Sequence, residues 1–481
     1  MSLSRFHRIV FFGATVLYVM AAWFSTGYHS ADEHFQIVAF AQWKLGELPA
    51  AHLPWEFAAG IRSSLQPWIA TVVFKGAAVL GVDDPFSRTF LLRLLTALLA
   101  LVAMRGLLRA TVTNYTERTG KRFLLLGYGL WFLPFLAVRF SSEGWSAIFL
   151  VLMVTSILRT KEDKRWIWKA GLCAGLAILC RPSTALIIMS SLAWSWLIRK
   201  DRLQDLGKFI AVIMATAFAG FLLDVLFYDR LVLTLWNYIA LGFGADPTVQ
   251  FDTLPWWYYP PWIIKYAIPP IGVLILLAFA VLLIHEPKHL LVWIMLPFLV
   301  AHSILPHKEL RFLYPLAPLI PWLLIEAWSI LQGPLARIPR WIMIPTAMVL
   351  AIANLLGLTM VVSTPAGEGR VRLAETLFRV TSPGDRIGYV IEPSVAWRIT
   401  LPAFYQPDGT VEVIIDPDRT GNMDVDYLIA QEVLHPSLTL DPSLLPLVRS
   451  QPHWSDQLMR WHTWDEGPAP WTLYKVVKAE P

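Results

Sequence analysis

Residues 208–227, KFIAVIMATAFAGFLLDVLF, are long and apolar enough to cross a lipid bilayer as one helix. Such a helix needs about 20 mostly apolar residues to match a hydrocarbon core of roughly 30 Å. Comparable runs lie on both sides of this stretch, at about 8–26, 88–108, 122–140, 143–160, 166–181, 182–199, 261–284, 289–305, 312–332 and 340–362. The sequence therefore predicts an α-helical polytopic membrane protein with a bundle of about 11 transmembrane helices.

The composition supports a membrane protein. Of 481 residues, 56% are hydrophobic and 16% are charged, whereas soluble domains contain about 25% charged residues. The 23 Trp and 34 Pro fit aromatic belts at membrane interfaces and helices broken inside a bundle. The net charge of +5 is not accompanied by a basic helix or an RNA-binding aromatic motif. Because the cationic residues lie in short loops, we attribute the charge to membrane orientation and expect no nucleic-acid partner.

The basic loops set an orientation for the predicted helices. They lie at the N-terminus and at 105–122, 159–165, 199–202, 285–289 and 334–340. All of them are cytoplasmic if the apolar run 65–82 is a juxtamembrane or re-entrant helix inside a long outer loop, 27–87. The non-cytoplasmic side then holds this loop, the turns at 141–145, 181–182 and 306–311, the segment 228–260 and everything after 363.

Residues 364–481 differ in character from the rest of the chain. Charge rises there, and strand-like runs alternate with segments of helical pattern such as 370–379. The strand-like runs are 387–391, 411–415, 427–430 and 472–477. We expect a transmembrane domain over 1–363 and a small soluble α/β domain over 364–481 on the outer face. Because this tail has no phosphate loop or metal-ligand pattern, packing or acceptor guidance is favoured over catalysis.

An acidic pair, Asp32-Glu33, directly follows the first predicted helix. Ionisable groups beside the bilayer are costly and usually functional. A carboxylate here could take a proton from a reacting hydroxyl. It could equally cap an interfacial helix, because Asp suits a helix N-terminus. Both interpretations are compatible.

A second ionisable cluster lies between two predicted helices, at His307, Lys308, Glu309 and Arg311. A solvated turn is the simpler interpretation of it. However, its mixed charge suits phosphate binding, with Arg as a bidentate clamp, Lys as a point charge and His as a further donor. Glu309 could orient these cations. We favour the functional interpretation of this cluster.

Further candidates come from the other outer segments. They are Trp55, Glu56 and Arg62 in the long outer loop, Arg139 and Glu143 around a tight turn, Arg181 in a break between two short apolar runs, and Tyr228 and Asn237 at or near the segment 228–260. A charged residue at such a break usually faces a cavity. No zinc-protease, Walker A or nucleophile-elbow motif is present in the sequence.

Three of these segments resemble the signature segments of the lipid-phosphate-mannose-dependent α-mannosyltransferases, the GT-C enzymes that extend the N-glycan precursor and the GPI anchor. The segments are DEHFQ at 32–36, WEFAAGIRSSLQP at 55–67 and, most specifically, HKELRFLYP at 307–315. The resemblance covers roughly residues 8–330. This chain departs from the family in having Ala31 where Pro is usual, and Ser142-Glu143 where Asn is usual.

The resemblance implies a GT-C-like bundle that transfers mannose, with inversion, from a polyprenyl-phosphate donor to a glycan or glycolipid acceptor. Asp32 matches the catalytic carboxylate, and Glu33 would position its partners or bind sugar hydroxyls. The leaving phosphate needs cations more than a proton donor. His307, Lys308 and Arg311 would supply them, with Arg62, Arg139 or Arg181, and the supporting residues would be Glu309, Glu56, Trp55, Glu143, Asn237 and Tyr228. Because protein cations can neutralise a phosphate, no metal or other cofactor is expected.

Other functions stay open at this point. They are a related GT-C transferase with another sugar or a protein acceptor, a lipid-linked sugar transporter, and an inactive scaffold. Transporters normally show internal repetition in hydropathy, and we find none in this chain. We expect a multi-pass protein of a plasma or inner membrane, or of the ER in a eukaryote, in contact with membrane lipids and with its active site on the non-cytoplasmic side.

Overall fold

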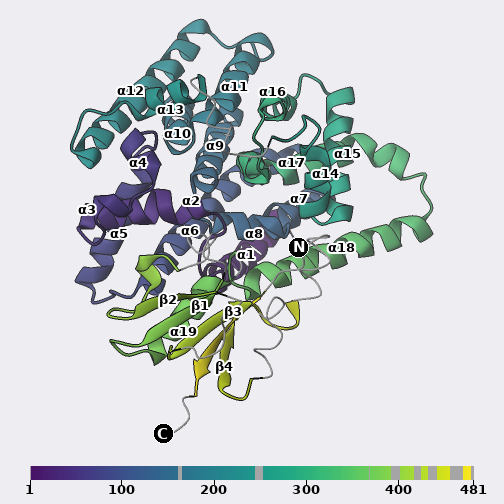
Figure 1. Ribbon diagram of the computed structural model, residues 1–481. Coiled ribbons are helices and arrows are strands. Elements are labelled where there is room, and N and C mark those ends of the chain that lie inside the picture. Colours follow the sequence, from purple (N-terminus) through teal and green to yellow (C-terminus); the bar gives the residue numbers. More distant parts are fainter. Residues whose placement is uncertain are drawn as a thin grey trace. The chain divides into compact units, whose positions relative to one another are not determined.

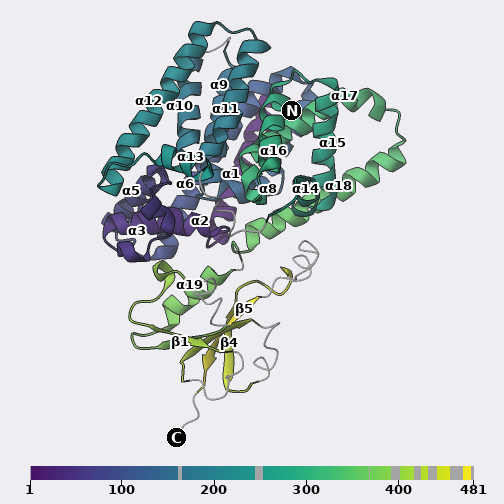
Figure 2. The same ribbon diagram turned by 45° about the horizontal axis from the view of Figure 1, so that its top comes forward.

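The computed structural model describes residues 2–160, 165–243, 253–367, 369–391, 401–416, 424–431, 441–455 and 470–477. The chain forms two compact units, whose elements are labelled in Figures 1 and 2. The first unit comprises residues 1–21, 31–76 and 92–362, and its described part is helical. The second comprises residues 22–30, 77–91 and 363–481 and contains a five-stranded sheet.

Every predicted apolar run is helical. The helices are α1 (Leu3–Phe24), α6 (Pro85–Thr111), α7 (Glu117–Gly129) with α8 (Phe132–Ala137), α9 (Ser142–Leu158), α10 (Trp166–Cys180), α11 (Ala185–Leu197), α12 (Leu203–Tyr228), α14 (Tyr259–Tyr266) with α15 (Pro269–His285), α16 (Leu290–Ile304), the 3₁₀ helix η6 (Leu310–Leu319) with α17 (Ile320–Leu335), and α18 (Arg340–Ser363). Within the described residues, five helical stretches have at least 18 residues and are apolar enough to cross a membrane, and α15 with α16 adds a pair bent by 117°. The polytopic helical fold is confirmed, and the number of about 11 crossings stays a prediction.

Prolines explain why some predicted runs consist of two helices. The break between α14 and α15 directly precedes Pro269 and Pro270. A proline disfavours helical backbone in the residue before it, which explains why α14 ends there. Pro315 and Pro318 lie inside η6, where the missing proline N–H groups interrupt the ladder of an α-helix. The sequence HKELRF therefore enters the bundle through a tighter 3₁₀ segment rather than an α-helix.

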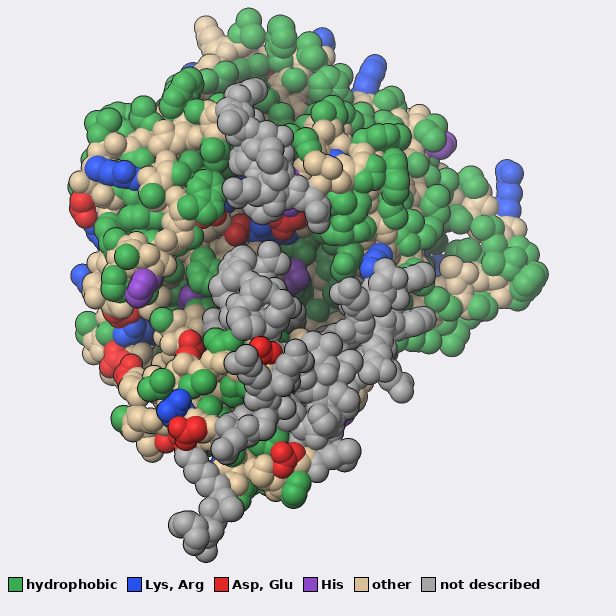
Figure 3. Space-filling model, in the orientation of Figure 1, with side chains coloured by type: hydrophobic (Ala, Val, Ile, Leu, Met, Phe, Trp, Pro, Cys, Tyr) green, Lys and Arg blue, Asp and Glu red, His purple; other side chains and the backbone are tan. Residues whose placement is uncertain are grey.

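One face of α12 carries exposed apolar side chains at every fourth position. Ile210, Met214, Phe218, Leu222 and Leu226 are between 47% and 64% exposed. Residues four apart share a helix face, so these side chains form a continuous apolar stripe of the kind that faces lipid. Figure 3 shows that green, hydrophobic side chains cover much of the visible helical surface.

The opposite side of α12 packs closely on α10. A Cβ atom at Gly171 would lie 2.7 Å from Cβ of Val212, and one at Gly175 would lie 2.5 Å from Cβ of Thr216. Small residues four apart allow two membrane helices to approach in this way. Since α10 also packs on α9 (Figure 1), the three helices fix the end of α10 before Arg181 and the start of α9.

The segment 27–87, which the sequence predicts to be a long outer loop, is largely helical, as expected. It contains α2 (Ala31–Glu33), the π-helix η1 (His34–Val38), α3 (Ala39–Leu45), α4 (Trp55–Ala59) and α5 (Leu65–Val79). Phe40 and Phe57 pack with Phe227 and Tyr228 at the end of α12. With 15 residues, α5 is shorter than a typical spanning helix.

The sheet of the second unit has the strand order β2-β1-β3-β5-β4. The strands are β1 (Arg386–Val390), β2 (Val411–Ile415), β3 (Tyr427–Gln431), β4 (Leu444–Arg449) and β5 (Trp471–Val476), with helix α19 at Arg370–Val380. Strand β1 pairs in parallel with β2 and β3, whereas β5 runs antiparallel to β3 and β4. The predicted α/β fold of the tail is confirmed. The sequence did not indicate β4, because Pro446 interrupts its pattern, and a proline is tolerated in such an edge strand.

Candidate active site

Asp32 and Glu33 lie in the single turn α2, immediately before the π-helix η1. Short π segments inside helices are frequent at functional sites. Glu33 is 8% exposed and His34 is 3% exposed. Burial lowers the pKa of His34 to about 3. This imidazole is therefore neutral near physiological pH and supplies no cation to the site.

Arg311 joins the acidic stretch to the cationic one. Its Nη1 donates to Oδ2 of Asp32 at 2.6 Å. Its Nε and Nη2 donate to the two carboxylate oxygens of Glu309 at 2.5 Å and 2.8 Å. This bidentate pair fixes the plane of the guanidinium group and directs Nη1 toward Asp32. The two stretches, which the sequence predicts to converge, meet through this side chain.

Glu143 connects a second arginine to the same cluster. Its Oε1 accepts from Nη1 of Arg181 at 2.5 Å and lies 3.9 Å from Nη1 of Arg311. The hydroxyl of Ser142 donates to the other carboxylate oxygen at 3.0 Å. Glu143 is only 2% exposed, so its charge is balanced by these two guanidinium groups rather than by solvent.

Arg139 approaches the other member of the acidic pair. Its Nη1 lies 3.8 Å from Oε2 of Glu33, and Arg139 is 2% exposed. The site therefore brings three guanidinium groups and four carboxylates together from α2, the start of α9, the end of α10 and the 306–311 turn. Phe312 adds an aromatic face, with Cζ of Arg181 5.0 Å from its ring centroid.

His307 belongs to the cluster through Glu309. Its Nε2 lies 3.1 Å from Oε1 of Glu309. Burial raises the pKa of Glu309, but the hydrogen bonds and charges of Arg311 and His307 lower it more, so the pKa lies below its ordinary value. Glu309 is thus held as a carboxylate, the form that can grip a guanidinium group.

Lys308 points away from this cluster. It is 3% exposed, and its Nζ donates to the carbonyl oxygen of Leu254 at 2.8 Å and to that of Leu305. These bonds tie the segment before α14 to the 306–311 turn. Trp55 is also apart from the cluster, at 55% exposure on α4. Phosphate binding by Lys308 and substrate binding by Trp55 stay predictions.

The other predicted residues hold the long outer loop in place. Oε1 of Glu56 accepts from the side-chain amide of Gln36 at 2.9 Å. The hydroxyl of Tyr228 donates to the backbone carbonyl of Arg62 at 2.7 Å. The side chain of Asn237 donates to two backbone carbonyls at the end of α4, each at 3.2 Å. Sequence reasoning missed Gln36, although an amide inside the DEHFQ signature was a signal that could have identified it.

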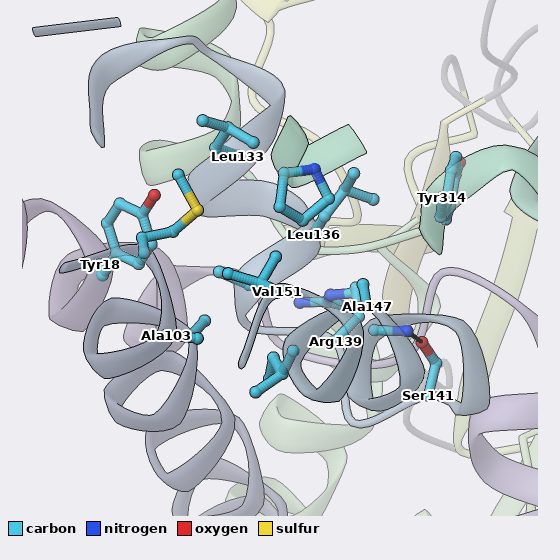
Figure 4. A pocket seen from close by; sticks show the side chains of 15 residues that line it. Tyr18, Ala103, Leu133, Leu136, Arg139, Ser141, Ala147, Val151 and Tyr314 are labelled. Atoms are coloured by element: carbon cyan, nitrogen blue, oxygen red, sulfur yellow. Dashed lines mark hydrogen bonds between the residues drawn. The ribbon is translucent and has the colours of Figure 1, made fainter. Parts of the chain in front are cut away.

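An apolar cavity adjoins Arg139 (Figure 4). It is lined by Tyr18, Ala100, Ala103, Met104, Leu133, Leu136, Ala137, Arg139, Ser141, Gly144, Ala147, Ile148, Val151, Tyr314 and Pro318. In Figure 4, Arg139, Ser141 and Tyr314 lie on the right of the view, and Tyr18 and Ala103 lie on the left. Tyr18 and Tyr314 were not expected from the sequence, because tyrosines in apolar runs resemble ordinary core residues.

The helical architecture and the solved structures that match it assign this protein to the membrane proteins with the GT-C fold. ArnT from Cupriavidus metallidurans, solved bound to undecaprenyl phosphate, matches 98% of this chain and 99% of its own with a TM-score of 0.55 and 12% sequence identity. The archaeal oligosaccharyltransferase AglB from Archaeoglobus fulgidus, solved with an inhibitory peptide and a dolichol-phosphate, matches 89% of this chain and 70% of its own at a TM-score of 0.50 and 11% identity. At these identities the similarity establishes the fold alone.

Residues 9–368 match the Alg9-like mannosyltransferase family, and the chain belongs to this family. GPI mannosyltransferase 3 from Candida albicans is 24% identical over 61% of this chain and 58% of its own length. The protein of the same name from Drosophila melanogaster is 25% identical over 68% of this chain and 57% of its own. The chain thus spans just over half the length of these curated relatives. The resemblance found in the sequence is confirmed.

Proposed function

We propose that this protein transfers mannose from a polyprenyl-phosphate donor to a hydroxyl of a glycolipid or glycan acceptor, with inversion, on the non-cytoplasmic side of the membrane. The observation that carries the proposal is the contact between the carboxylate of Asp32 and the guanidinium group of Arg311 at 2.6 Å. A base and a phosphate-binding cation are thereby close enough to act on one sugar. The family supports mannose as the sugar, and the solved ArnT complex supports a polyprenyl-phosphate carrier.

The reaction needs one proton acceptor and one anion site. The acceptor hydroxyl attacks the anomeric carbon of mannose while its proton passes to Asp32. The bond between that carbon and the phosphate oxygen breaks, and the phosphate leaves with the electron pair. Arg311, Arg181 and Arg139 stabilise the negative charge that grows on this oxygen. Attack from the face opposite the leaving phosphate inverts the configuration.

Donor binding changes the partners of Arg311 in this mechanism. Two nitrogens of its guanidinium group are held by Glu309, and the third bonds to Asp32. A donor phosphate oxygen takes the place of Asp32 at this third nitrogen, because the bidentate Glu309 contact is the stronger of the two. The carboxylate of Asp32 is then released from its ion pair with Arg311 and is available to the acceptor hydroxyl. The donor therefore prepares the base for the acceptor.

The test uses the purified protein in lipid nanodiscs with polyprenyl-phosphate mannose, polyprenyl-phosphate glucose and a mannose-containing GPI precursor as acceptor. We expect transfer from the mannose donor alone, an α-linked product, and loss of transfer in Asp32→Ala. Transfer of glucose without mannose would contradict the proposed donor. A β-linked product from a β-linked donor would contradict inversion.

A further inference from the structure

A buried carboxylate outside the charged cluster holds the turn between α4 and α5. Asp224 lies on the membrane helix α12 and is 1% exposed. An unpaired charge at such a position is very costly. Asp224 is instead surrounded by donors. It accepts from the backbone N–H of Ser64 at 2.6 Å, the hydroxyl of Ser64 at 2.7 Å, the hydroxyl of Ser63 at 3.4 Å and the hydroxyl of Thr234 at 2.5 Å.

The neighbours of Asp224 hold the same stretch of backbone. Residues 56–66, which we call the bridge segment, run from α4 into α5. Its carbonyl groups accept hydrogen bonds from Tyr228 (to Arg62), Arg230 (to Phe57 and Ala58) and Asn237 (to Ala59 and Gly60). Gly60 has φ +61°, and a Cβ atom there would lie 2.5 Å from a side-chain carbon of Val232. The backbone of the bridge segment therefore packs directly against the chain that follows α12.

The two ends of the bridge segment reach the two halves of the charged cluster. At one end, Glu56 accepts from Gln36 at 2.9 Å, and Gln36 lies on the π-helix that follows Asp32. At the other end, Gln66 donates to the backbone carbonyl of Ser141 at 3.1 Å. Ser141 caps helix α9, within the turn that carries Arg139 and Glu143. The bridge segment therefore spans from the base to the arginine turn.

We propose that Asp224 is a positioning residue for the transfer reaction. Through the bridge segment it sets the placement of the Asp32 turn against the turn of Arg139 and Glu143, without touching substrate itself. The inference rests on the proposed function, because the spacing matters only if both turns act on one sugar. Misplacing a reacting group by about 1 Å costs roughly 100-fold in rate. Loss of Asp224 thus lowers kcat more than it weakens donor binding, since the arginines keep their own partners.

The experiment compares Asp224→Asn and Tyr228→Phe with Asp229→Asn as a matched control. Asp229 is a nearby carboxylate whose side chain is 70% exposed and pairs with Lys44 rather than with the bridge segment. We expect kcat per folded molecule to fall about tenfold or more in Asp224→Asn and less in Tyr228→Phe, with donor KM changed less than about threefold. Hydrogen exchange of residues 56–66 should rise in both variants. The control should stay within about twofold of wild type.

A double-mutant cycle adds a readout that a purely structural role does not move. Because Asp224 and Gln36 act on the base through one segment, Asp224→Asn combined with Gln36→Ala should cost less than the product of the two single losses. If the wild type is active and both Asp224→Asn and Tyr228→Phe keep a normal kcat per folded molecule, the positioning role is wrong and the proposed function stands. Unchanged exchange over 56–66 leads to the same conclusion. A folded wild type without mannosyl transfer overturns the proposed function instead.

Discussion

Arg311 donates to Asp32 across 2.6 Å, although 279 positions separate these residues in the sequence. The same guanidinium group is held on its other edge by Glu309. In the proposed mechanism, the carboxylate that serves as the base and the anionic donor therefore compete for one cationic nitrogen. This competition makes donor affinity depend on the charge of Asp32, in a direction opposite to the effect on turnover.

Asp32→Asn is expected to abolish turnover while tightening donor binding. The amide cannot accept the proton, and general-base catalysis contributes about 10²- to 10⁴-fold. However, Nη1 of Arg311 no longer faces a competing charge, so affinity for polyprenyl phosphate should rise severalfold. Isothermal titration with polyprenyl phosphate checks the affinity, and Asp229→Asn is the control. Weaker or unchanged binding in Asp32→Asn would show that no exchange occurs at Arg311.

Arg311→Lys is expected to behave almost like Arg311→Ala. An ammonium group cannot grip both oxygens of Glu309 and also point a third donor at a phosphate. We expect kcat to fall about 100-fold or more in both variants. Arg230→Lys is the comparison, because it makes the same exchange at an arginine that donates to the backbone carbonyls of Phe57 and Ala58. Activity in Arg311→Lys within about fivefold of wild type would mean that charge alone suffices at this position.

The sequence predicts much of the bundle because apolar run length and basic loops report directly on a bilayer. It also predicts the meeting of Asp32 with the 307–311 turn, through motifs that resemble a family. It does not predict which way each charge points. Lys308 donates to the carbonyls of Leu254 and Leu305. The turn that carries it leads into the 3₁₀ helix η6, which the hydrophobic periodicity of the sequence does not predict. Nor does the sequence indicate that Asp224 accepts four hydrogen bonds, because three of the donors belong to Ser63 and Ser64, far from it in the chain.

Lys308→Met distinguishes a role in tying backbone segments together from the phosphate-binding role that the sequence suggests for Lys308. If Lys308 mainly ties backbone segments together, its loss removes a hydrogen-bond donor from the carbonyls of Leu254 and Leu305 and lowers thermal stability. The kcat of the folded fraction should then stay within about threefold of wild type. Thermal unfolding in nanodiscs and active-site titration provide the two measurements. A drop of about 100-fold in kcat with unchanged stability would restore the phosphate-binding role that the sequence suggests.

Chelation tests whether arginines alone neutralise the leaving phosphate. Arg139, Arg181 and Arg311 lie within one cluster, and guanidinium groups can offset the charge of a phosphate. We expect EDTA treatment followed by gel filtration to change kcat by less than about twofold. The comparison is the same protein supplied with MgCl₂ or MnCl₂. A loss of activity that either salt restores would establish a metal requirement.

Labelling of single cysteines with a thiol reagent tests the predicted membrane orientation. Ala51 and Arg118 are both exposed, the first within the segment 27–87 and the second in the first turn of α7, inside the basic segment 105–122. Cys173 is half-buried and Cys180 is buried, and their replacement by Ala gives a background for single cysteines. We expect a membrane-impermeant maleimide to label Ala51→Cys on intact cells and Arg118→Cys only after permeabilisation, because basic loops stay in the cytoplasm. The reverse pattern would place Asp32 on the cytoplasmic face. The site would then take its donor from the cytoplasmic leaflet, and the proposed non-cytoplasmic reaction would be wrong.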